Sequence, residues 1–166
     1  MATNNTRSGF PGQGRANPGY RDGDRGTREP EPTLDPSGIR FGAQISPNLY
    51  SDIAEHAARQ VADHSGRDRN KGTQLRRFYD ELVMLQSKVG SSTDSNSDSR
   101  FAAQHPYVQM LKAKVAYARG RNKVDSNFES LLRHVVDQIK DHETFRQAKL
   151  FMEAFMAFYK VHGPKE

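Results

Sequence analysis

From residue 46 onward, apolar residues recur at the three- and four-residue spacing of amphipathic helices. The first stripe consists of Leu49, Ile53, Ala57 and Val61. It predicts a helix that opens with Ser46 as its cap and Pro47 as its first residue, and that stops at Gly66. The second stripe consists of Leu75, Phe78, Leu82, Leu85 and Val89. It predicts a helix that begins near Thr73 and stops at Gly90.

A polar linker separates these two helices from the next part of the chain. Residues 90–100, GSSTDSNSDSR, contain no core-forming side chain and are rich in residues that favour turns. The third predicted helix begins around His105 and Pro106 and ends at Gly120. Its apolar stripe consists of Val108, Leu111, Val115 and Ala118.

Two more helices complete the pattern. The fourth opens at Ser126, which together with Glu129 has the spacing of a capping box. Its stripe consists of Phe128, Leu131, Leu132, Val135 and Ile139. The fifth covers about residues 141–162 and ends at a Gly-Pro pair. Its segment 150–159, LFMEAFMAFY, is apolar on nearly every face, which is typical of a central core helix or of a helix in a subunit interface.

These elements predict an all-α protein, a compact bundle of about five helices in residues 46–166, because no segment alternates for long enough to form a strand. Residues 1–45 differ: they hold eight of the thirteen glycines and five of the eight prolines, with few apolar residues. Such a segment cannot bury enough surface to offset its ordering entropy, so we expect a disordered tail. Its arginine–glycine pieces are typical of RNA-binding tails, but six arginines face five acids, which favours a flexible extension.

Composition narrows the classes of protein. The chain has 166 residues, a formal net charge of +5 and no cysteine, which excludes disulfides and thiolate chemistry. No apolar run reaches the roughly 18 residues of a membrane-spanning helix, and the N-terminus lacks the apolar core of a secretory signal. We therefore expect a soluble, cytoplasmic protein with no membrane partner.

Positive charge is concentrated in two segments. Residues 67–77 have a net charge of +4, and residues 112–123 have a net charge of +5 and no acid. Because the whole chain is only +5, the remaining residues have a net charge of −4. Clustered Lys and Arg bind phosphates independently of sequence, since they displace condensed counterions. The pattern therefore indicates a polyanionic partner.

Residues suited to catalysis form no recognised pattern. The six histidines are scattered without HExxH spacing, and there is no P-loop or Rossmann glycine pattern. A minor alternative is a metal site formed by His134, Asp137, Asp141 and His142, along one side of the fourth helix and its end. We expect no catalytic residue, no metal and no cofactor.

Two motifs resemble a known family. TQLRRFYDEL at residues 73–82 and LKAKVAYARGR at residues 111–121 are similar to the small subunit of type III-A CRISPR effector complexes, the Csm small-subunit family. The resemblance covers roughly residues 47–162 and implies a compact helical protein without an active site. It also implies a subunit that stacks in several copies beside the backbone subunits and the polymerase-like large subunit. Such a subunit contacts the target RNA and its duplex with the CRISPR RNA without reading sequence.

The resemblance and the charge pattern together give the candidate RNA-binding residues. They are Arg76, Arg77, Lys112, Lys114, Arg119 and Arg121, with Lys71 and Lys123 in second rank. Arg76 and Arg77 lie about 100° apart on a helix, so we expect one to face RNA and the other to face an acid such as Glu81. Tyr79 and Tyr117 could stack on bases or belong to the half-buried core.

Two alternatives to an RNA-binding scaffold remain open. One is a helical adaptor that docks onto a protein through its aromatic C-terminal helix and binds no nucleic acid. The other is a small helical enzyme that uses the histidines. Charge reversal at Arg76 and Lys112 separates the scaffold from the adaptor, and metal analysis tests the enzyme.

Overall fold

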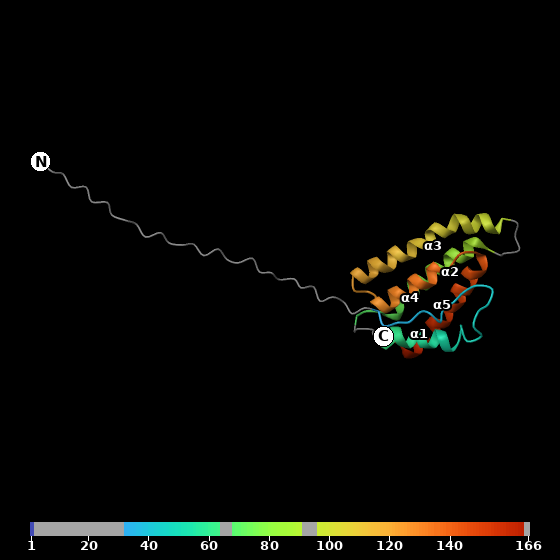
Figure 1. Cartoon of the computed structure of the whole chain (residues 1–166), viewed down its shortest axis with the longest axis horizontal. Helices are drawn as coiled ribbons and strands as arrows, with labels where there is room; N and C mark the ends of the chain where they lie inside the picture. The colour runs from blue at the N-terminus through green and yellow to red at the C-terminus, as the bar shows by residue number, and fades with distance from the viewer. Residues whose placement is uncertain (2–31, 64–67, 91–95, 165–166) are drawn as a thin grey trace.

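The computed structural model describes residues 1, 32–63, 68–90 and 96–164. Within these ranges the protein contains five α-helices and no β-strand, as the sequence predicted. The helices are α1 (Asp52–Asp63), α2 (Gly72–Val89), α3 (Ser97–Gly120), α4 (Ser126–Asp137) and α5 (His142–His162). Figure 1 shows them packed as one bundle, which confirms the all-α class.

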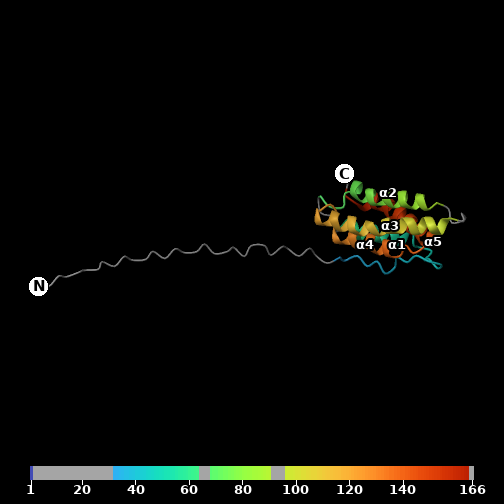
Figure 2. The same ribbon diagram turned by 90° about the horizontal axis from the view of Figure 1, so that it is seen from above.

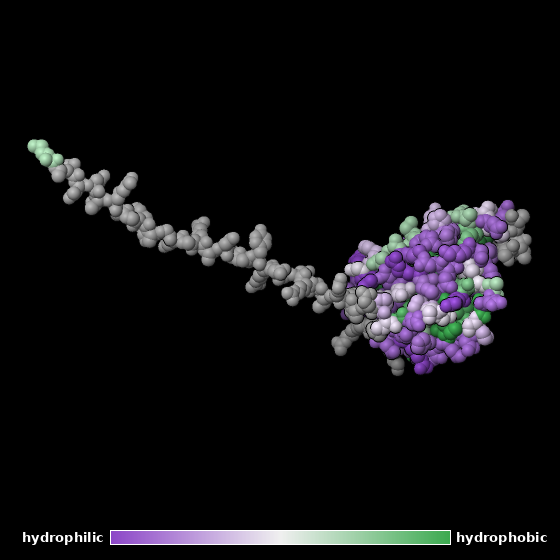
Figure 3. All heavy atoms as spheres, in the orientation of Figure 1, coloured by the Kyte–Doolittle hydropathy of each residue, from purple (hydrophilic) through white to green (hydrophobic). Residues whose placement is uncertain are grey.

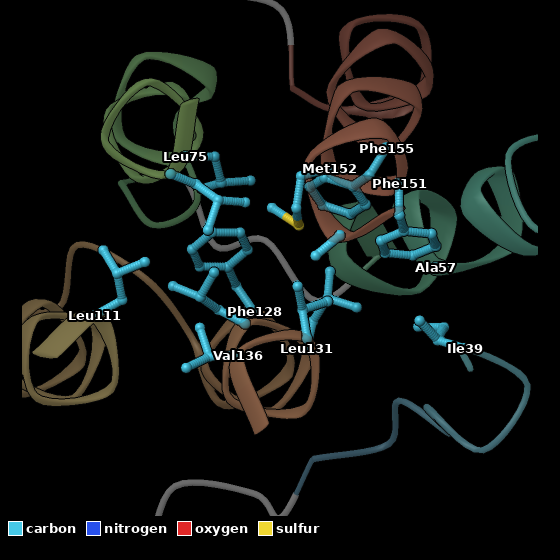
Figure 4. Packing of buried hydrophobic residues seen from close by; sticks show 14 of the residues in the cluster. Ile39, Ala57, Leu75, Leu111, Phe128, Leu131, Val136, Phe151, Met152 and Phe155 are labelled. Atoms are coloured by element: carbon cyan, nitrogen blue, oxygen red, sulfur yellow. The ribbon is translucent and has the colours of Figure 1, made fainter. Parts of the chain in front are cut away.

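The most apolar helix, α5, supplies one side to the core, while Glu143, Arg146 and Glu153 lie on its exposed side. It packs against α1 on one side and α2 on the other, while α2 packs on α3 and α3 on α4 (Figure 4). The side chains of Phe151, Met152 and Phe155 point from α5 into the core, towards Phe128 and Leu131 of α4. All five side chains are fully buried. The helix is therefore core-forming on one side and not enclosed on all sides, and the alternative of a subunit interface stays a prediction.

The space between α1 and α4 is covered by the N-terminal strap, which we define as residues 32–45. Leu34 and Ile39 of the strap are buried in the common core, and Figure 4 shows Ile39 beside α1 and α4. Figure 2 shows the strap along the side of the bundle opposite α2. The prediction of a disordered tail over residues 1–45 is therefore wrong for residues 32–45. Residues 2–31, with the arginine–glycine pieces, lie outside the described part of the chain.

Side-chain amides form hydrogen bonds with the backbone of the strap, as a neighbouring strand would in a β-sheet. The amides are those of Asn127, Gln138 and Gln147. Gln147 accepts a hydrogen bond from the Gly42 N–H at 2.8 Å and donates one to the Gly42 carbonyl at 3.0 Å. Such pairs satisfy backbone groups that would otherwise be left without partners. Because Gln147 lies 105 positions after Gly42, no local sequence pattern reveals this contact.

The predicted starts of α2, α4 and α5 lie within one residue of the observed starts, whereas the starts of α1 and α3 were predicted wrongly. α2 ends at Val89 with Gly90 as its C-cap, and α3 ends at Gly120, as the sequence indicated. Ser46 and Pro47, the predicted start of the first helix, instead form a turn whose carbonyl at Ser46 accepts a backbone hydrogen bond at 3.0 Å, and α1 begins further along the chain. The predicted stop at Gly66 lies outside the described residues.

α3 is longer than the sequence predicted. It begins at Ser97 and continues through Pro106, so the predicted linker at residues 90–100 overlaps its first turn. A tertiary contact stabilises the additional turns, because the ring of Phe101 packs 6.4 Å from the ring of Phe145 in α5. This contact helps to offset the stability that α3 loses because Pro106 cannot donate a helical hydrogen bond.

The cap of α4 lies one residue before the predicted position. Asp125 Oδ1 accepts a hydrogen bond from the Phe128 N–H at 2.9 Å, while Ser126 is already helical. The predicted capping box of Ser126 and Glu129 is therefore wrong, and the Glu129 carboxylate binds arginines instead.

Candidate nucleic-acid interface

α2 and α3 run antiparallel, so the first turns of α2 lie beside the last turns of α3 (Figure 1). This arrangement brings together the two basic segments, which are well separated in the sequence. Between them is a groove of about 400 Å³, which we call the α2–α3 groove. It is lined by Gln74, Arg77, Phe78, Glu81, Lys114, Tyr117, Ala118, Arg121 and Lys123.

Helical periodicity places the charged side chains of α2 outside the core. Leu75 and Leu82 are fully buried, whereas Arg77 lies on the flank of the helix and is exposed. Phe78 is half-buried, and its ring packs 5.6 Å from the ring of Phe128. Phe78, at the floor of the α2–α3 groove, thus packs on the core, and Arg77 lies at the rim of the groove.

Positive charge dominates the α2–α3 groove. Arg77, Lys114, Arg121 and Lys123 contribute four cations, and Glu81 is the one acid among the lining residues. The Lys114 ammonium forms an ion pair with Glu81 across the two helices. Arg77 and Lys123 form no ion pair with any residue that the structure describes. The groove therefore presents two cations that no acid of the described residues neutralises.

Tyr117 adds an aromatic surface to these cations. Its side chain is 67% exposed, so the alternative of a half-buried core tyrosine is wrong. The Arg121 guanidinium donates a hydrogen bond to the Tyr117 hydroxyl at 3.1 Å and lies 5.8 Å from the ring centroid. This contact orients the ring and the guanidinium together at the mouth of the groove.

Two predicted RNA-binding residues face α4 instead of the groove. Lys112 and Arg119 share one face of α3, as their seven-residue spacing requires. Lys112 forms an ion pair with Asp137 of α4, and the Arg119 guanidinium binds the Glu129 carboxylate at 2.9 Å. The acids of α4 thus balance part of the positive charge of residues 112–123.

Arg76 and Lys71 lie outside the α2–α3 groove as well. Arg76 is exposed and pairs with Asp80, one turn later in α2, at 3.5 Å. It lines a different cavity, on the side of α2 that faces α5. Lys71 pairs with Asp68 at 3.6 Å. An α-helix turns by about 100° per residue, so the consecutive residues Arg76 and Arg77 face different flanks of α2.

Sequence reasoning missed three residues that shape the groove. They are Gln74, Phe78 and Glu81. Gln74 and Glu81 lie three and four positions from Arg77, so helical spacing alone could have placed them on the same flank. The partner of Glu81 was predicted wrongly, because Lys114 from the neighbouring helix takes the place of Arg77.

The residues of the alternative metal site have separate partners. His134, Asp137, Asp141 and His142 contact the Ile39 carbonyl, the Lys112 ammonium, Thr144 and the Gly90 carbonyl in that order. In residues 1, 32–63, 68–90 and 96–164, no group of three His, Asp or Glu side chains could hold a metal ion. None of the helices described is long and apolar enough to cross a membrane.

Comparisons with known proteins identify the family. The family model described as Csm2 Type III-A matches residues 48–165, which covers α1 to α5 and both motifs of the α2–α3 groove. No curated protein and no solved structure matches the chain. The family match agrees with the resemblance of the two basic motifs and with residues 47–162 as the rough extent of that resemblance. The chain therefore belongs to the Csm2 family, the small-subunit family of type III-A CRISPR effector complexes.

Proposed function

We propose that this subunit is a non-catalytic scaffold that binds the backbone of RNA in the α2–α3 groove. The observation that carries the proposal is the excess of cations there, drawn from two segments that only the fold brings together. Membership of the Csm2 family supports an RNA partner, because type III-A effectors are RNA-guided complexes.

The chemistry of the groove favours phosphate groups over base edges. Lys and Arg side chains bind phosphates without regard to sequence, and they do so by releasing counterions. Tyr117 offers a flat face on which any base can stack. The proposed contact is therefore independent of sequence, and base pairing with the CRISPR RNA supplies the specificity.

The proposed partners follow from this role. They are the target RNA, its duplex with the CRISPR RNA, further copies of the chain, the backbone subunits and the polymerase-like large subunit. One copy offers few phosphate contacts, so its affinity for RNA is modest. Several copies along one strand bind with avidity, since each further contact becomes intramolecular.

An adaptor role through α5 has less support in the structure. The aromatic side chains of Phe145, Phe151 and Phe155 are fully buried and are not available for docking. The face shown in Figure 3 is largely hydrophilic, with a compact hydrophobic area near the strap. The bundle uses its aromatic helix for its own core.

The test compares two triple variants of the full-length chain. Arg77→Gln/Lys114→Gln/Arg121→Gln removes three groove cations, and Arg40→Gln/Lys88→Gln/Lys140→Gln removes three exposed cations elsewhere. Binding of a labelled single-stranded RNA is measured by fluorescence anisotropy over a range of salt concentrations. At roughly 1 kcal/mol per contact, the groove variant should bind about a hundredfold more weakly. Its salt slope should fall by about 2, at roughly 0.7 per phosphate on a single strand.

The control variant should retain the affinity of the unaltered chain apart from a small non-specific loss. Equal losses in both variants would mean that RNA responds to net charge and not to the groove. Unchanged binding by the groove variant would refute the proposal. Circular dichroism of both variants checks that the helices are intact.

A further inference from the structure

α2 lies between α3 and α5 (Figure 4), so its other flank borders a second hollow. This hollow, the α2–α5 cavity, has a volume of about 560 Å³, compared with about 400 Å³ for the α2–α3 groove. It lies between the first turns of α2 and the last turns of α5. Its size is within the range of small-ligand sites in proteins.

The α2–α5 cavity combines cations with apolar and aromatic surface. Arg76 of α2 and Lys160 of α5 are exposed cations among its lining residues, and Lys160 forms no ion pair within the described ranges. Tyr79 and Met156 are half-buried and provide apolar surface. Burial raises the pKa of the Tyr79 hydroxyl. The acid that lines the cavity, Glu153, is already paired with a lysine at 3.0 Å.

One wall of the cavity is held by a buried hydrogen bond. The Tyr159 hydroxyl donates a hydrogen bond to the Asn70 carbonyl at 2.6 Å, which ties the end of α5 to the start of α2. Gly163 lies so close that a Cβ there would be 2.6 Å from the Tyr159 carbonyl oxygen. The chain can fold back at this point because glycine has no side chain, and Pro164 then completes the wall. A wall fixed in this way does not have to be ordered when a ligand binds.

We propose that the α2–α5 cavity binds a nucleotide of the same RNA strand that occupies the α2–α3 groove. This inference rests on the proposed function. Arg76 and Arg77 are consecutive, and each lines one of the two hollows. A strand that crosses the first turns of α2 therefore passes from one cation directly to the next.

The chemistry of the cavity matches a nucleotide in two respects. A base packs against the apolar surface of Tyr79 and Met156, where stacking on an aromatic ring tolerates any base. The flanking phosphates lie near Arg76 and Lys160, which bind them as charge-assisted partners. Arg76 already pairs with Asp80 at 3.5 Å, so an uncharged apolar peptide would leave Lys160 without an acidic partner among the described residues.

The experiment uses two independent variants of the full-length chain. Ala157→Phe fills the cavity from an exposed position of α5, and Arg76→Gln/Lys160→Gln removes its two cations. The matched controls are Ala103→Phe, an exposed position of α3, and Arg40→Gln/Lys140→Gln. Each is titrated with single-stranded RNA of about 4, 8 and 16 nucleotides, the span of site sizes in single-strand-binding folds. Adenosine monophosphate is titrated separately.

We expect both cavity variants to bind the longest strand about tenfold more weakly than the unaltered chain, the loss associated with one stacked base. The shortest strand should bind equally to the unaltered chain, the cavity variants and their controls, because it occupies only the α2–α3 groove. Unchanged binding of the longest strand by both cavity variants would overturn the inference. In that case the groove variant Arg77→Gln/Lys114→Gln/Arg121→Gln would still lose RNA if the proposed function is right.

Two other outcomes are informative. Loss of RNA in the cavity variants with none in the groove variant would refute the proposed function and leave the cavity as the RNA site. Free adenosine monophosphate could bind the cavity as tightly as the longest strand does. The ligand of the cavity would then be a mononucleotide. That result would overturn the assignment to the RNA strand.

Discussion

The two faces of α3 carry the same charges and use them differently. Lys112 and Arg119 point to α4, where acidic side chains neutralise them. Lys114 and Arg121 point to the α2–α3 groove, where Glu81 is the one acid among the lining residues. A single basic motif thus supplies both a structural contact and a candidate RNA surface.

The difference is made by the neighbouring helix and not by α3. α4 offers Asp137 and Glu129, and Glu129 is only 11% exposed, so it can accept from two guanidinium groups in a sheltered place. α2 contributes Arg77 to the groove, which adds a cation instead of balancing one. Net charge along a sequence therefore overstates the charge that is free to bind a partner.

The largest expected effect is on RNA affinity, when the cations of the two faces of α3 are neutralised in separate variants. Lys114→Gln/Arg121→Gln should weaken RNA binding about tenfold or more, because each lost charge-assisted contact is worth roughly 1 kcal/mol. Lys112→Gln/Arg119→Gln removes the same charge from the opposite face and should change the affinity less than about twofold. Fluorescence anisotropy with single-stranded RNA measures both. Equal losses would show that the comparison between the faces is wrong.

The next largest effect is on the free energy of unfolding, when an acid of α4 that binds the cations of α3 is removed. Glu129→Gln removes the carboxylate that binds Arg119 at 2.9 Å and Arg133 at 3.1 Å. Unfolding in urea should show a loss of about 1–3 kcal/mol, the range for a largely buried charged partner. The control, Glu143→Gln, removes a 54% exposed carboxylate and should cost less than about 1 kcal/mol. RNA binding by Glu129→Gln should stay within about twofold of the unaltered chain. A large loss would mean that the α4 face also binds RNA.

A smaller effect, of opposite sign, is expected in the groove. Glu81→Gln removes the acid that pairs with Lys114. RNA should then bind roughly fivefold more tightly, since about 1 kcal/mol of repulsion is lost and Lys114 is released. Asp98→Asn, at the far end of α3, is the matched control and should leave the affinity unchanged. Weaker binding by Glu81→Gln would indicate that this pair positions Lys114 for RNA.

The smallest effect is expected at the exposed pair of the α4 face. Asp137→Asn releases Lys112, but the Asp137 side chain is 58% exposed, so stability should change by less than about 1 kcal/mol. RNA affinity should also remain within about twofold, because the released lysine lies away from the groove. A clear gain in affinity would place Lys112 on the RNA path after all.

Much of the fold was predictable from local pattern. The spacing of Leu75, Leu82 and Leu85 located α2, and Gly90 marked its end. The start of α3 was missed because Pro106 indicates a helix start in isolation, whereas a ring contact by Phe101 extends the helix backwards. Local rules describe one helix at a time and do not include such contacts.

The strap shows the same limit more clearly. Leu34 and Ile39 are too widely spaced to indicate an element, yet both are buried. Their backbone is held by amides such as Asn127, 93 positions away from Leu34. Only the folded structure brings these groups together, so composition alone suggested disorder.

For the candidate site, sequence predicted which residues are basic but not which way they face. Helical spacing separated Lys112 from Lys114 and Arg76 from Arg77. It could not show that Asp137 lies next to Lys112, 25 positions earlier in the chain. The direction of each cation depends on packing between helices, and that information is not local.

We expect RNA to lie in the α2–α3 groove of the assembled complex. Ultraviolet crosslinking of a type III-A complex bound to target RNA, followed by mass spectrometry of this subunit, tests this expectation directly. We expect crosslinked peptides that contain Tyr117, because its exposed ring lies beside the groove cations. Crosslinks confined to α4 and the strap, which do not line the groove, would contradict it.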